Sequence, residues 1–185
     1  MTADATVAGF VSADSYPEDH RAGFACFVGR PNVGKSTLTN TLVGSKIAIT
    51  SNRPQTTRHA VRGIVHRDDA QLVLVDTPGL HRPRTVLGQR LNDIVRATWS
   101  EVDVIGLCIP ADQPIGPGDR FIAAELSRLN QRNLFAVVTK TDLVDREQLT
   151  NQLIAVATLG DFTQIVPVSA ESGDQVGLLA DLLTE

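Results

Sequence analysis

The sequence lacks the features of several classes of protein. No stretch comes near the roughly 18 consecutive apolar residues of a membrane-spanning helix. Residues 1–20 have no basic segment before their short apolar patch, as a signal peptide would have. Two cysteines, Cys26 and Cys108, are too few for a disulfide framework, and both lie in apolar runs, so we interpret them as small buried side chains. We therefore expect a cytoplasmic protein.

Carboxylates are also missing, but only from one part of the chain. Residues 20–67 contain eight Lys or Arg residues and no Asp or Glu, although the net charge of the whole chain is −4. Residues 1–19 carry four acids and no base, and residues 68–185 carry seventeen acids against nine bases. The acid-free segment is where a polyanion should bind. Because the rest of the chain shows no basic face for nucleic acid, we expect a phosphate-bearing small molecule.

The hydrophobic pattern predicts one α/β domain. Residues 1–21 are acidic and without period, so we expect a mobile tail, and 22–185 have the size of one domain. Apolar runs typical of strands alternate with amphipathic stretches typical of helices, which favours a mostly parallel sheet between two layers of helices. The strand-like runs are 23–29, 60–66, 71–76, 103–110, 133–139 and 164–169, and the helix-like stretches are 35–43, 87–101, 118–130, 145–158 and 175–183.

One strand should break the parallel arrangement. The runs 60–66 and 71–76 are separated by too few residues for a crossover helix, so we expect an antiparallel hairpin at one edge of the sheet. The predicted fold class is therefore the P-loop NTPase three-layer sandwich, with a mostly parallel six-stranded sheet and one antiparallel edge strand.

The strongest motif is GRPNVGKST at residues 29–37, which matches the P-loop pattern and stands between a strand and a helix start. The backbone N–H groups of such a loop point at phosphate oxygens, and the helix N-terminus adds partial positive charge. Lys35 would reach the β- and γ-phosphates, and the Ser36 hydroxyl would bind Mg²⁺. A glycine-rich turn without a ligand is the alternative. The predicted nucleotide-binding residues here are Gly29, Arg30, Pro31, Asn32, Val33, Gly34, Lys35, Ser36 and Thr37.

Two further segments could face the γ-phosphate and the metal. Asp76 ends a strand and begins DTPG, so its carboxylate could hold Mg²⁺ through water, and the backbone N–H of Gly79 could face the γ-phosphate. In the polar loop 51–59 we favour Thr57 over Thr56 as the residue that completes the Mg²⁺ shell. A simple turn and a plain surface loop are the alternatives for these two segments.

The TKTD sequence at 139–142 predicts recognition of guanine. Its Asp142 carboxylate can accept hydrogen bonds from N1–H and the N2 amino group of guanine, whereas adenine would leave that charge unpaired; such a contact discriminates by ~1–3 kcal/mol. The stem of Lys140 would lie along the base. A solvated loop is the alternative. The predicted base-binding set is Thr139, Lys140, Asp142, Leu143, and the backbone of Ser169 and Ala170.

Four motifs together carry a family resemblance. GRPNVGKST, PQTTRH, DTPGLH and VSAESG occur in this order over residues 23–183 and resemble those of the Era family of bacterial ribosome-assembly GTPases, in the translation-factor-like branch of P-loop GTPases. The resemblance implies GTP and Mg²⁺ binding, slow hydrolysis, and a molecular switch in maturation of the small ribosomal subunit. In such a switch, 44–58 and 77–90 would be ordered by the γ-phosphate and released after hydrolysis.

The family also implies a C-terminal KH domain that binds ribosomal RNA. A KH domain needs a GxxG loop, and no glycine pair has that spacing in these 185 residues. We therefore expect the isolated GTPase domain, without the KH domain, and weak RNA binding.

Two departures from the family pattern affect chemistry. Thr139 stands where the family has Asn, and a hydroxyl cannot copy both ends of an amide's contacts, so we expect nucleotide binding weaker by ~1 kcal/mol, with guanine preference kept by Asp142. Leu80 stands where many GTPases have a glutamine that orients the attacking water. We hypothesise that Asn32 holds a K⁺ ion that supplies positive charge between the phosphates, as in similar GTPases. The alternative is that Asn32 only braces the loop.

The predicted catalytic residues are accordingly Lys35, Asn32, Thr57 and Gly79. Three other interpretations remain open at this stage. One is a nucleotide-sensing module with little turnover, for which Leu80 argues. Another is a P-loop kinase or ATPase, against which Asp142 argues. The third is the GTPase domain of a related assembly or tRNA-modifying protein.

Overall fold

The computed structural model describes residues 20–44, 60–67, 69–76, 86–129 and 133–185. Residues 1–19 of the predicted tail, most of the two predicted switch segments, and Thr57, Gly79 and Leu80 lie outside these residues, whereas Arg21, predicted as the end of the tail, begins the first strand. Within them, no helix is long and apolar enough to cross a membrane.

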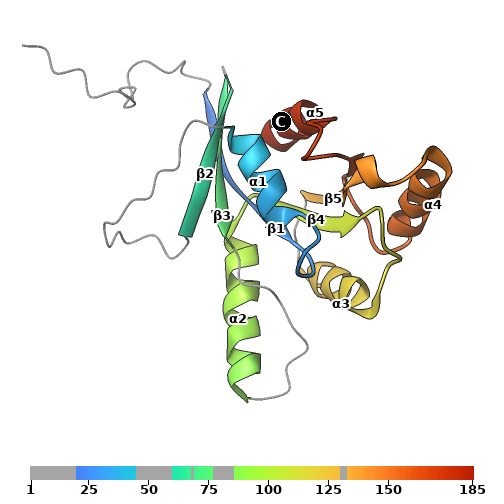
Figure 1. The fold of residues 1–185 in the computed structure, drawn as a ribbon. Coiled ribbons are helices and arrows are strands. Elements are labelled where there is room, and N and C mark those ends of the chain that lie inside the picture. The colour runs from blue at the N-terminus through green and yellow to red at the C-terminus, as the bar shows by residue number, and fades with distance from the viewer. Residues whose placement is uncertain (1–19, 45–59, 68, 77–85, 130–132) are drawn as a thin grey trace, which may run out of the picture.

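The described residues form one six-stranded sheet with helices on both faces (Figure 1). The strand order is β2-β3-β1-β4-β5-β6, and β2 pairs with β3 antiparallel while every other neighbouring pair is parallel. The predicted fold class, including the antiparallel edge strand, is confirmed. The elements are β1 (Arg21–Val28), α1 (Lys35–Val43), β2 (Ala60–His66), β3 (Ala70–Asp76), α2 (Val86–Glu101), β4 (Val104–Pro110), α3 (Pro117–Leu126), β5 (Leu134–Thr139), α4 (Arg146–Ala157), β6 (Gln164–Pro167) and α5 (Val176–Thr184).

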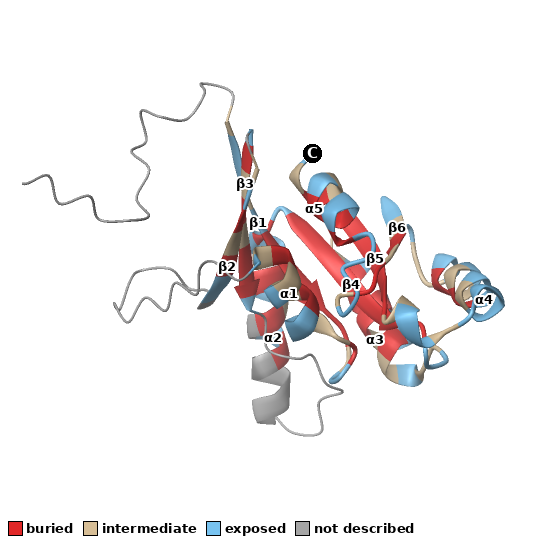
Figure 2. Ribbon diagram, turned by 45° about the horizontal axis from the view of Figure 1, so that its top comes forward, coloured by how far each residue is buried: buried red, intermediate tan, exposed pale blue. Residues whose placement is uncertain are grey.

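The core has two halves because side chains alternate across the sheet. On β1, Ala25 and Phe27 belong to the cluster that contains residues of α1 and α5, whereas Cys26 and Val28 belong to the cluster of α2, α3 and α4. Strands β4 and β5 are buried along their whole length, as Figure 2 shows. Both cysteines are buried as predicted, and burial raises the pKa of each thiol to about 12, so neither is a reactive thiolate at neutral pH.

Two predicted elements end at least two residues earlier than expected. The helix expected over 118–130 ends at Leu126, because Arg128 and Leu129 donate backbone hydrogen bonds three residues back and tighten the chain into a final turn. The strand expected over 164–169 ends at Pro167.

The parallel strands place the loops that matter for function. The carboxyl ends of parallel strands lie at one edge of the sheet. The P-loop follows β1, Asp76 ends β3, the TKTD loop follows β5, and Ser169 follows β6. Segments more than a hundred residues apart in the sequence therefore meet at this edge.

Close packing at the sheet centre generates a stability prediction. A Cβ at Gly106 of β4 would lie 2.6 and 2.7 Å from two ring carbons of Phe27. Since β4 is buried throughout, Gly106→Ala must displace that ring, and overpacking of this kind costs ~1–3 kcal/mol. We expect the midpoint of urea unfolding to fall with an unchanged slope.

The matched control is Gly177→Ala in α5, where an added Cβ meets nothing within 4 Å. This substitution should leave the midpoint unchanged or raise it slightly, because alanine favours helix over glycine. Equal losses of stability in the two variants would contradict the packing explanation.

Candidate nucleotide-binding site

The P-loop joins β1 to α1 and closes around the side chain of Lys35. The Nζ atom of Lys35 donates to the backbone oxygens of Gly29, at 3.0 Å, and of Arg30, at 2.7 Å. Asn32 and Gly34 adopt left-handed backbone conformations, with φ of 63° and 97°, which turn the chain back over the lysine. The predicted loop residues from Gly29 to Thr37 thus form one continuous turn into the first residues of α1.

Burial lowers the pKa of the Lys35 ammonium group, and the nearby Cys108 and Asp76 act in the opposite direction. A partly desolvated cation at a helix N-terminus is a strong attractor for phosphate, because little water must be removed before contact. The geometry of the loop therefore suits an anion.

Asp76 and Ser36 line one small pocket beside this lysine. The pocket has a volume of about 50 Å³ and is also lined by Phe27, Lys35, Thr39, Asn40, Arg62 and Val75. The guanidinium of Arg62 donates to the Asp76 carboxylate at 2.5 Å, and both side chains are about half exposed. The pocket therefore brings a hydroxyl and a carboxylate together from two elements, which is the oxygen-donor chemistry that Mg²⁺ prefers.

Thr139 connects the base loop to the P-loop. Its buried hydroxyl donates to the backbone oxygen of Val33 at 2.6 Å, across 106 residues of sequence. An asparagine at this position would contact both the P-loop and the base. The threonine keeps the contact with the P-loop. The hydroxyl has one proton, so while it donates to Val33 it cannot also donate to a base. The predicted weakening of nucleotide binding thus concerns the base end alone and remains a prediction.

The Asp142 carboxylate is fixed in orientation by Ser169. The Ser169 hydroxyl donates to Asp142 Oδ1 at 2.5 Å, and the backbone N–H of Ser172 donates to the Ser169 hydroxyl at 3.1 Å. The sequence predicts a role for the backbone of Ser169 only. Its side-chain role was missed because the sequence alone gives no distance between residues 27 positions apart. Asp142 itself is exposed, so its second oxygen is available to a ligand.

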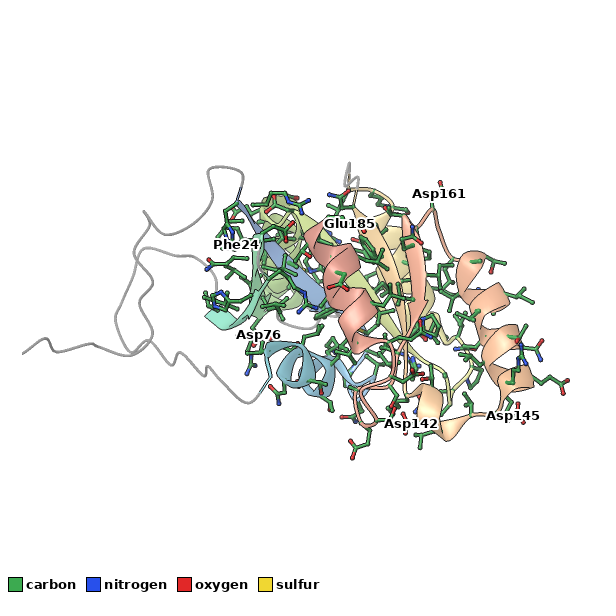
Figure 3. All side chains as sticks on the ribbon, turned by 90° about the horizontal axis from the view of Figure 1, so that it is seen from above. Phe24, Asp76, Asp142, Asp145, Asp161 and Glu185 are labelled. Carbon is green, nitrogen blue, oxygen red and sulfur yellow. The ribbon has the colours of Figure 1, made fainter. Side chains whose placement is uncertain are left out.

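The other predicted base-site residues lie around this pair. Lys140 has a left-handed backbone, and its Nζ lies 3.6 Å from Asp112 Oδ2, a neighbour that sequence reasoning also missed. Leu143 is exposed, and the backbone oxygen of Ala170 accepts a hydrogen bond from Thr41 of α1. Figure 3 shows Asp76 and Asp142 at the same edge of the molecule, with α1 between them in this view.

The described residues contain no group of three or more His, Cys, Asp or Glu side chains that could hold a metal ion by themselves. A Mg²⁺ ion at Ser36 and Asp76 would therefore need phosphate oxygens or water as further ligands, which is how Mg²⁺ is usually bound with nucleotides.

The Thr139 contact generates a prediction. Thr139→Val removes the hydroxyl but keeps the shape of the side chain, and it leaves the Val33 carbonyl without this partner. We expect a loss of ~1–2 kcal/mol in the free energy of unfolding, measured in urea. Thr139→Ser keeps the donor and should lose clearly less. If valine and serine variants are equally stable, the hydrogen bond is not what joins the two loops.

Comparison with known protein families agrees with this geometry. Residues 24–140 match the family described as 50S ribosome-binding GTPase. The GTPase Era of Streptomyces coelicolor is 69% identical over 170 residues, which cover 89% of this chain and 54% of that protein. The chain therefore spans about half the length of the curated relatives it matches.

Solved structures of Era have the same fold. A variant of Aquifex aeolicus Era bound to GDP·AlF4− superposes with a TM-score of 0.71 at 33% identity, covering 88% of this chain and 56% of that one. Era in complex with MgGDPNP and nucleotides 1506–1542 of 16S ribosomal RNA gives a TM-score of 0.69 at 32% identity, over 89% of this chain and 56% of that one. The chain belongs to the 50S ribosome-binding GTPase family and is similar, over most of its length, to the GTP-binding domain of the Era GTPases.

Proposed function

We propose that this chain binds GTP with Mg²⁺, hydrolyses it slowly, and acts as a molecular switch in assembly of the small ribosomal subunit. The observation that carries the proposal is the joining of a phosphate loop to a guanine-type base loop through the Thr139–Val33 hydrogen bond. We assign the GTPase domain to residues 22–185. The ribosomal role is carried over from relatives of which this chain spans about half, and for these 185 residues alone we expect weak RNA binding.

The choice of ribosomal subunit rests on the relatives. The matching family is described by 50S binding, whereas the solved Era complex contains a segment of 16S ribosomal RNA, which is the RNA of the small subunit. The family description covers residues 24–140 only, while the Era relatives match 89% of the chain at 62–69% identity. We therefore favour the small subunit.

The chain's own groups suit a Mg²⁺-nucleotide. The Ser36 hydroxyl would coordinate the ion directly, and the Asp76 carboxylate would do so through water, once Arg62 releases it. The ion would neutralise charge on the β- and γ-phosphates. The Lys35 ammonium would exchange its two backbone acceptors for phosphate oxygens. Thr57 and Gly79, which we propose as the further metal ligand and γ-phosphate donor, lie outside the described residues.

Leu80 cannot orient the attacking water as a glutamine would, so turnover needs another means of stabilising the transition state. We propose that Asn32, exposed on its left-handed turn, contributes its side-chain oxygen to a K⁺ ion beside the phosphates. Fixed positive charge where negative charge develops is the principle of the arginine finger, which accelerates hydrolysis by ~10³–10⁵. The alternative function, a nucleotide sensor that scarcely turns over, is favoured by Leu80 and predicts no effect of K⁺.

Base specificity gives a first test. In Asp142→Asn the Oδ1 atom can still accept from Ser169, but the Nδ2 group now donates toward the base instead of accepting. We expect GDP affinity to fall by a factor of ~5–150, the equivalent of one bidentate base contact, and affinity for xanthosine diphosphate to rise, because xanthine has an acceptor at C2. Fluorescence titration measures both. A variant that keeps its preference for guanine would contradict the assigned role of Asp142.

Potassium dependence gives a second test. GTP turnover is measured with Mg²⁺ in KCl and in NaCl at equal ionic strength, with ATP as control substrate. We expect faster turnover in KCl for the wild-type chain, and no difference between salts for Asn32→Ala. Equal slow rates in both salts for the wild-type chain would contradict the proposed role of K⁺. Cleavage of ATP as fast as GTP would contradict specificity for guanine.

A further inference from the structure

The side chain of Arg30 leaves the P-loop and reaches helix α3. Its Nε donates to Asp119 Oδ1 at 2.8 Å. The Asp119 side chain is completely buried, whereas that of Arg30 is 28% exposed. A buried carboxylate is costly unless it is paired, so this contact holds both partners tightly. Arg30 is among the predicted nucleotide-binding residues; its Nε is bound to Asp119, so that prediction now concerns its backbone.

Asp119 is also fixed by its own helix. Its second oxygen, Oδ2, accepts the backbone N–H of Gly116 at 2.8 Å, which caps the N-terminus of α3. Both carboxylate oxygens are therefore used, one by the helix and one by Arg30. The carboxylate cannot follow a movement of Arg30 without breaking the cap, so it is a rigid anchor.

The stem of Arg30 lies directly against the first turn of the same helix. A Cβ at Gly118 would lie 2.9 Å from Arg30 Cδ and 3.1 Å from Cγ. The glycine therefore leaves the space through which the arginine passes on its way to Asp119.

The main chain of Arg30 meets the phosphate-binding lysine. Its backbone oxygen accepts from Lys35 Nζ at 2.7 Å. One residue thus connects the anchored end of α3, through its side chain, to the lysine of the P-loop, through its carbonyl group.

We propose that Arg30 is a positioning residue that anchors the P-loop to α3 through Asp119. The inference rests on the proposed nucleotide binding and adds a residue that acts without touching the ligand. A fixed loop need not be ordered again each time a nucleotide binds, so the contact slows release of the nucleotide. GDP and GTP should be affected alike, because the loop holds phosphates that they share.

The test measures release of a fluorescent GDP analogue by stopped flow from the wild-type chain, Arg30→Met, Arg30→Lys and Arg120→Met. Release from Arg30→Met should be about tenfold faster, as expected for the loss of one hydrogen bond between charged groups. Arg30→Lys restores a donor for Asp119 and should recover part of the slow release. Arg120 is an exposed arginine on the same helix, so Arg120→Met should release at the wild-type rate.

A double variant separates positioning from stability. Arg30→Met alone leaves the buried Asp119 charge without a partner and should lower the midpoint of thermal unfolding. Arg30→Met combined with Asp119→Asn leaves no buried charge and should recover much of the lost thermal stability. Release from the double variant should stay fast. Slow release from the double variant, or from Arg30→Met, overturns the inference and leaves the proposed function intact. A wild-type chain that binds no guanine nucleotide overturns both.

Discussion

The parallel pairing of β1 with β3 and β4 is the constraint on which the rest of the structure depends. Buried residues of each of these strands belong to both halves of the core, so its register cannot slip by one residue without exchanging the two halves. Fixed register places the carboxyl ends of the strands at one edge, where the P-loop and Asp76 leave the sheet. The hydrogen bond from Thr139 to Val33 then adds the base loop to the same edge. The site is thus a consequence of packing in the core.

Helix α3 holds two neighbouring elements through buried carboxylates. Asp119 near its start holds Arg30 of the P-loop. Glu125, also buried, accepts hydrogen bonds from Arg96 of α2 at 2.7 Å and from Arg128 at 2.6 Å. The P-loop and α2 are therefore tied to one short helix by two buried carboxylates. A shift of α3 must strain both ties, so we infer that the helix acts as a common support for the loop and for the helix that follows Asp76 in the chain.

The sequence was sufficient for the features that have local signals. The P-loop is contiguous, the hairpin follows from the short spacing between its strands, and Asp142 stands in a short motif after an apolar strand. The missed contacts all join residues that are distant in the sequence. In the sequence, Asp119 is an acidic residue in the first turn of a helix, where acids are common, and only the fold shows that Arg30 lies beside it. The same holds for the Ser169 hydroxyl, which acts on Asp142 from the loop after another strand.

The contacts around the site also explain how an acidic chain can receive a polyphosphate. Four of the carboxylates that the structure describes at this edge already have a donor or cation within reach. An arriving phosphate would therefore meet carboxylates that already have partners instead of bare negative charge, which keeps the electrostatic cost of binding small. Exposed pairs such as Arg62–Asp76 are weakly held and can be exchanged, whereas the buried pair of Arg30 and Asp119 cannot. We therefore expect the exposed groups to contact the ligand and the buried pair to support them. The pairs are Asp76 with Arg62, Asp112 with Lys140, Asp119 with Arg30, and Asp142 with Ser169.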